Sequence, residues 1–129
     1  MLPKINPTQT EAWKALNTHF AQNDFELRSL FQYNPERFNQ FSVQRKEYLF
    51  DYSKNLIDAK TFELLQNLAE ESKLKSAIDA MFSGEKINET EGRAVLHTAL
   101  RDFSDQEILV DGENIKPGIK RVLNQMKTF

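Results

Sequence analysis

Three basic residues, Arg93, His97 and Arg101, recur at intervals of four in the sequence. On an α-helix this spacing places them in one row, and a row of cationic groups suits a phosphate. A phosphate site usually also offers backbone N–H groups, but the nearby Gly84-Glu85-Lys86 lacks the glycine spacing of a phosphate loop. A solvated or salt-bridged row is therefore the favoured interpretation, and phosphate binding is the alternative. The acidic residues available for pairing are Asp79, Glu85, Glu89 and Glu91.

Other catalytic chemistry has weaker signals. A metal site would have to combine His19 and His97 with carboxylates, because the chain has no cysteine, and the two histidines show no ligand spacing. Glu89 and Glu91 stand at an expected helix start, where capping or salt bridging is favoured over proton transfer. No serine lies in a nucleophile-elbow sequence. We therefore predict no catalytic, substrate-binding or metal-binding residue in this chain, and no cofactor.

The stretch that contains the basic row is expected to form a helix. Ser83 and Gly84 would end the preceding helix, and Asn88 or Thr90 would cap the next one. Asn88 and Glu91 have the spacing of a capping box. The residues expected to form the apolar stripe of this helix are Ala94, Val95, Leu96, Ala99 and Leu100.

Aromatic residues alternate with polar ones between Phe41 and Tyr52, a pattern that favours two strands of a β-hairpin around a Gln44–Glu47 loop. Such rings could also stack on single-stranded nucleic acid. A stacking platform needs a basic groove, and the nearby basic residues are offset by acidic ones. Packing of the aromatic rings in the core is therefore expected, and no nucleic-acid partner is predicted.

Capping and breaking residues predict helices along most of the remaining chain. The residues expected to start them are Asn6 with Pro7, Asn23-Asp24, Asp58, Ser72 and Pro117. Ile108–Val110 is expected to be a short buried strand followed by an Asp111-Gly112 turn, without a second strand in reach to pair with it. The last helix has no stop signal. Together these features predict an α-rich α+β segment, 1–129, cut from a larger α/β protein.

Composition describes an ordinary intracellular chain. The 129 residues carry a net charge of −2, with 40% apolar and 28% charged residues and no cysteine. This charge gives no general attraction to nucleic acid or anionic membranes, and no apolar run approaches the roughly 20 residues that span a bilayer. A cytoplasmic location without a membrane partner is expected.

Several stretches resemble the glucose-6-phosphate isomerase family over essentially the whole chain. The most specific, Phe82–Arg101, reads FSGEKINETEGRAVLHTALR, and the others include Ile5-Asn6-Pro7-Thr8, Asp51-Tyr52-Ser53-Lys54-Asn55 and Ile108-Leu109-Val110-Asp111-Gly112. Asp102-Phe103 stands where the family commonly has Asn-Arg, and Glu107 stands where Pro is frequent. These departures affect a loop.

The resemblance implies the N-terminal portion of an enzyme of glycolysis and gluconeogenesis that interconverts glucose 6-phosphate and fructose 6-phosphate. In that family a glutamate base moves a proton through a cis-enediol without metal or nucleotide, and the enzyme is a cytoplasmic homodimer. Its catalytic and phosphate-binding residues would lie outside this chain. We therefore expect a structural segment that is inactive alone. The alternative is a small non-catalytic helical interaction module that docks through Ile108–Val110 and the last helix.

Overall fold

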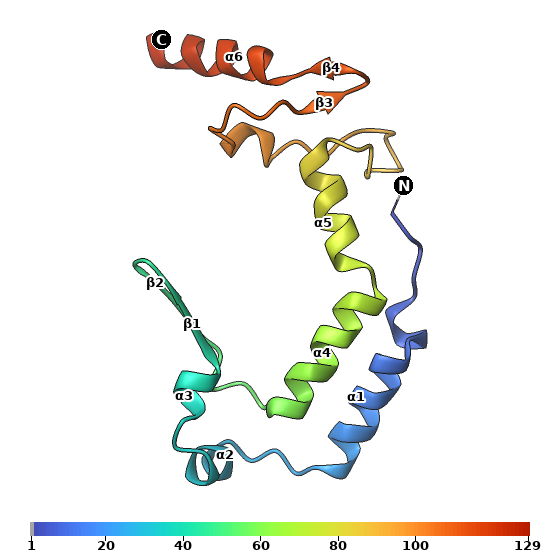
Figure 1. The fold of residues 1–129 in the computed structure, drawn as a ribbon, viewed down its shortest axis with the longest axis vertical. Coiled ribbons are helices and arrows are strands. Elements are labelled where there is room, and N and C mark those ends of the chain that lie inside the picture. Colours follow the sequence, from blue (N-terminus) through green and yellow to red (C-terminus); the bar gives the residue numbers. More distant parts are fainter. Residues whose placement is uncertain (1) are drawn as a thin grey trace. The chain divides into compact units, whose positions relative to one another are not determined.

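A computed structural model describes residues 2–129 as two compact units, drawn in Figure 1. Asn6–Ser72 forms one unit, and residues 2–5 with Lys73–Phe129 form the other. Helices and two small antiparallel hairpins make up both units, which confirms the predicted α-rich α+β class. In residues 2–129 no helix is long and apolar enough to cross a membrane.

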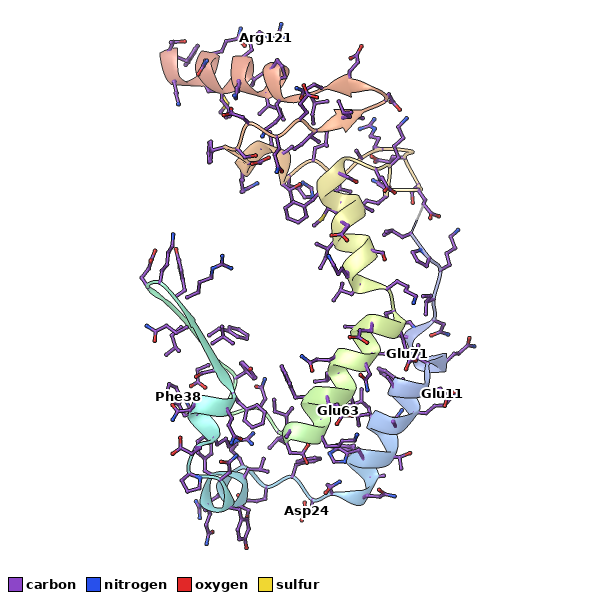
Figure 2. All side chains as sticks on the ribbon, in the orientation of Figure 1. Glu11, Asp24, Phe38, Glu63, Glu71 and Arg121 are labelled. Atoms are coloured by element: carbon purple, nitrogen blue, oxygen red, sulfur yellow. The ribbon has the colours of Figure 1, made fainter. Side chains whose placement is uncertain are left out.

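The first unit is built on two antiparallel helices that lie side by side. Its elements in chain order are η1 (Pro7–Gln9), α1 (Glu11–Gln22), α2 (Leu27–Tyr33), α3 (Arg37–Gln40), β1 (Ser42–Arg45), β2 (Tyr48–Asp51) and α4 (Ala59–Glu71). Ala12 of α1 and Leu64 of α4 are buried. Figure 2 shows Glu71 at the end of α4 beside Glu11 at the start of α1. The Glu71 carboxylate accepts hydrogen bonds from the backbone N–H groups of Glu11 (2.9 Å) and Ala12 (3.1 Å).

The predicted start at Asn6 and Pro7 is correct for η1 but not for the long helix. Asn6 accepts the N–H of Thr8, and the chain then leaves the helical conformation at Thr10. The Thr10 hydroxyl accepts the N–H of Trp13 and caps α1. Asp58 caps α4 as predicted, in a reciprocal box with Thr61.

The predicted hairpin is present, with a tighter turn than expected. β1 pairs with β2 through Val43↔Phe50 and Arg45↔Tyr48, so Gln44 and Arg45 belong to the strand. The connection is Lys46-Glu47. Lys46 adopts φ 54°, a positive value that two-residue hairpin turns need and that glycine more often provides. The expectation that the hairpin rings all pack in the core is wrong, because Tyr48 and Phe50 are exposed.

The second unit contains α5 (Leu74–Ser83), η2 (Ala99–Arg101), β3 (Leu109–Val110), β4 (Glu113–Asn114) and α6 (Lys116–Thr128). Ser72 does not cap α5 as predicted; it ends α4, and Lys73 with φ 57° turns the chain into α5. Gly84 ends α5 as predicted, with φ 85°. A Cβ there would lie 2.8 Å from the carbonyl oxygen of Leu109, so this position requires glycine for both conformation and space.

The predicted helix from Asn88 or Thr90 to Arg101 is wrong. Asn88 and Arg93 exchange backbone hydrogen bonds as an isolated antiparallel bridge, and Gly92 between them has φ 63°. The Asn88 side chain does accept the N–H of Glu91, but the contact closes a turn (3.3 Å). Only η2 is helical in this stretch. A local pattern of apolar residues did not outweigh the bridge and the left-handed glycine.

The strand predicted at Ile108–Val110 finds a partner after all. β3 pairs with β4 through Leu109↔Asn114 and Val110↔Glu113. Asp111 (φ 54°) and Gly112 (φ 83°) form the turn in the manner of a type I′ hairpin. Of the predicted strand only Ile108 is buried, since Leu109 is exposed. The polar β4 sequence gave no strand signal, which explains the missed pairing. α6 begins around Pro117 as expected.

Candidate functional site

The predicted basic row does not form. Arg93 lies in the bridge, His97 in a turn and Arg101 in η2, so the three residues share no helix face. All three are exposed. Arg93 pairs loosely with Glu91 (3.7 Å), and Arg101 Nη1 donates to the backbone carbonyl of His97 (3.2 Å). The salt-bridge interpretation therefore holds for Arg93, and the arrangement does not assemble a phosphate site from the row.

Two of the acidic residues predicted to pair with that row bind other cations. Glu89 pairs with Lys4 (3.0 Å), and Asp79 pairs with Lys75 one helical turn earlier on α5 (3.2 Å). Both pairs are at least partly exposed and contribute little stability. Glu89 thereby connects the N-terminal residues to the loop that follows α5, within the same unit.

A buried lysine connects two segments of the second unit. Lys116, at the start of α6, is only 6% exposed, and its Nζ donates to Asp102 Oδ2 (2.8 Å) and to the carbonyl of Ser104 (2.6 Å). The hydrogen bond from Lys116, with the N–H of Ser104, lowers the pKa of Asp102 to about 2. These contacts hold the loop between η2 and β3 against α6. The cation is already paired with protein groups, so its role is structural.

A buried arginine holds the segment that follows β2 to α3 within the first unit. Arg37 is 1% exposed; Nε donates to the Ser53 carbonyl and Nη2 to the Asn55 carbonyl, both at 2.7 Å. Its guanidinium also lies 4.7 Å from the ring centroid of Phe41 and 5.6 Å from that of Phe31. Burial lowers the pKa of Arg37, although the arginine stays charged. Like Lys116, this cation serves the fold.

Among the described residues, His19 is the histidine whose two ring nitrogens both have side-chain hydrogen-bond partners. Its Nε2 lies 3.0 Å from Asp58 Oδ1, and its Nδ1 lies 3.2 Å from the amide nitrogen of Asn23. An amide N–H donated to Nδ1 leaves Nε2 as the protonated nitrogen that donates to Asp58. Burial acts to raise the pKa of Asp58, but hydrogen bonds from Thr61 and from His19 outweigh it and leave the pKa lowered.

The hollow beside His19 does not suit a substrate. Its volume is about 190 Å³, below the roughly 300 Å³ at which ligand pockets begin. The lining is mostly apolar: Trp13, Leu16, Asn17, His19, Phe20, Phe25, Leu56 and Thr61. Both ring nitrogens of His19 are hydrogen-bonded to protein groups, so neither nitrogen is free to act as a catalytic base. His19 therefore positions the start of α4, through Asp58, against the end of α1.

The part of the chain that the structure describes offers no arrangement of side chains that could hold a metal ion. No group of three or more His, Asp or Glu side chains lies close enough to hold an ion there. The two buried cations, Arg37 and Lys116, were not singled out from the sequence. Neither has a local signal, because their partners lie 12 to 18 residues away along the chain.

Comparison with known proteins shows where such a chain occurs. The description of the family whose model matches residues 51–129 is phosphoglucose isomerase. Over 130 aligned residues, and along its whole length, the chain is 49% identical to a protein of Desulforapulum autotrophicum named glucose-6-phosphate isomerase. The chain spans 23% of the length of that relative. These similarities do not favour a small stand-alone interaction module.

Proposed function

The chain belongs to the phosphoglucose isomerase family, and on this premise we propose that it is the N-terminal part of a glucose-6-phosphate isomerase. The full polypeptide interconverts glucose 6-phosphate and fructose 6-phosphate, a step of glycolysis and gluconeogenesis. The observation that carries this proposal is the 49% identity along the entire chain to a relative of that name. The Phe82–Arg101 signature, quoted above, supports the same assignment.

Within that enzyme, residues 1–129 act as a structural segment without a complete sugar-phosphate-binding domain. Supporting this, Arg37 and Lys116 are buried and hydrogen-bonded to backbone carbonyls and to Asp102, and His19 is held between Asp58 and Asn23. The groups that would bind phosphate and move the proton therefore belong to the rest of the polypeptide. The segment alone has no isomerase activity.

A coupled assay tests both statements. The full-length polypeptide is expected to convert fructose 6-phosphate to glucose 6-phosphate, detected by oxidation of the product with a dehydrogenase. Residues 1–129 alone are expected to give the rate of buffer. An inactive full-length protein would refute the assignment, whereas turnover by residues 1–129 would refute only the structural role.

The finer features of the proposal come from the family resemblance. The enzyme is a cytoplasmic homodimer that needs neither metal nor nucleotide, and its small-molecule partner is a sugar phosphate. A net charge of −2 on this segment supports the expectation that nucleic acid is not a partner. Light scattering of the full-length protein tests the dimer, and an unchanged rate after chelation tests the independence from metal.

A further inference from the structure

The β1–β2 hairpin has one mostly aromatic and one largely polar face. Residues directly opposite in an antiparallel pair share a face, and faces alternate along each strand. By the register, Val43 and Phe50 share a face with the Arg45↔Tyr48 pair, and the pair Phe41 and Tyr52 continues this face beyond the strand ends. The five apolar and aromatic residues of this face are called the aromatic face, and the exposed Arg45 borders them beside the hairpin turn. The opposite face carries Ser42, Gln44, Leu49 and Asp51.

The inner half of the aromatic face is packed. Phe41 is 4% exposed and lies edge-on to Tyr52, with ring centroids 6.0 Å apart. Tyr52 in turn stacks on Phe62 of α4, also at 6.0 Å. The base of the hairpin is thus part of the core of its unit, as the alternating sequence predicted.

The outer half of the same face is uncovered in residues 2–129. Phe50 touches Tyr52 with its ring centroid 5.6 Å away, yet it is 69% exposed. Tyr48 is 73% and Val43 56% exposed. A two-stranded hairpin is marginal in water unless its apolar face packs on something. The row of rings formed by Phe62, Tyr52 and Phe50 therefore begins at the packed base of the hairpin and ends at the exposed Phe50.

We propose that the outer half of the aromatic face is the docking surface on which the rest of the same polypeptide packs. This inference rests on the proposed function, which makes residues 1–129 part of a longer chain. The curated relative is more than four times as long, since this chain spans 23% of it. A long remainder is available to cover the face.

The size of the surface favours a tethered segment over a second copy of residues 1–129. A Phe or Tyr side chain offers about 150–250 Å², so the exposed parts of Tyr48 and Phe50, with Val43, offer roughly 300–400 Å². A stable interface between separate proteins buries about 800 Å² on each partner. A covalently connected segment does not lose the translational freedom of a separate partner, so a smaller patch suffices for it.

Thiol labelling provides the test, because residues 1–129 contain no cysteine. Phe50→Cys places a thiol on the outer aromatic face, and Gln44→Cys is the matched control on the opposite face of the same hairpin. Val43→Cys, across from position 50, is a second probe should the first variant fail to fold. Each variant is made in the full-length polypeptide, with its other cysteines replaced by serine, and in residues 1–129. The rate of reaction with a maleimide is measured together with isomerase activity.

In the full-length polypeptide, the maleimide is expected to react with the Phe50→Cys variant at least about 100-fold more slowly than with the Gln44→Cys variant. In residues 1–129 the two rates should agree within a few fold at every protein concentration. Equal rates in the full-length protein would overturn the proposal, and so would protection in residues 1–129 that grows with concentration, which indicates a second copy. Protection in a full-length protein without isomerase activity would refute the proposed function and leave the docking surface standing.

Discussion

Replacement of Arg37 should unfold the hairpin region at much lower denaturant concentration. In Arg37→Met, the carbonyls of Ser53 and Asn55 lose their 2.7 Å donors, and hydrogen bonds to charged groups are each worth about 1.5–3 kcal/mol. Loss of the contact with the Phe41 ring adds about 0.5–2 kcal/mol. The apolar packing of methionine offsets part of this loss, so we expect a net destabilisation of about 3–4 kcal/mol, by balance of these terms.

The assay for Arg37→Met is urea unfolding of the chain, followed by circular dichroism. With a slope of about 1–3 kcal/mol per M urea, the expected loss lowers the midpoint by at least about 1 M. Arg37→Lys should fall between wild type and Arg37→Met, because one ammonium cannot reproduce the planar fork to two carbonyls. Arg45→Met on the exposed strand β1 is the matched control and should shift the midpoint little. A loss below about 1 kcal/mol for Arg37→Met would refute the structural role of this buried cation.

Three further changes test other contacts. Because the pKa of Asp102 is lowered to about 2, its bond to Lys116 stabilises the fold above the unfolded pKa near 4 and is lost as the pH falls towards 2; Asp102→Asn should flatten the acid unfolding curve in that window. Gly84→Ala should lower the melting temperature, as the residue has φ 85° and no room for a Cβ, whereas Gly118→Ala in the open part of α6 should not. Glu71→Ala removes the acceptor for two N–H groups of α1 and should cost about 1–2 kcal/mol by chemical denaturation; no loss would show that water replaces the carboxylate.

The parts of the fold that follow from local chemistry could be predicted. Asp58 caps α4, Gly84 ends α5, and Asp111-Gly112 makes a turn, because each depends on the preferences of one or two residues. The helix expected beyond Asn88 failed for the complementary reason. Its apolar stripe is a local signal too, but the backbone pairing of Asn88 with Arg93 takes the hydrogen bonds that a helix would need.

The buried cations lay beyond sequence reasoning. No periodic pattern of neighbouring residues marks Arg37 or Lys116 as buried. Charged residues are seldom buried unless they are paired. The burial of Arg37 and Lys116 depends on carbonyls and a carboxylate that lie far away along the chain and are brought close by the tertiary fold. The predicted helical row of basic residues failed in the opposite direction, since Arg93, His97 and Arg101 shared a spacing but not a helix.

The hairpin shows how a correct pattern can lead to an incorrect statement about one segment. Alternation from Phe41 to Tyr52 predicted a buried face, and the structure buries Phe41 while it leaves Phe50 in solvent. Sequence alternation reflects the environment of a residue in the whole folded polypeptide, whereas the exposed fractions of Phe41 and Phe50 refer to residues 2–129 alone. If residues 1–129 were a complete module, selection for solubility would disfavour an exposed aromatic row on a short hairpin with unpaired edges. The disagreement between pattern and exposure is therefore itself an argument that the aromatic face belongs to the interior of a longer protein.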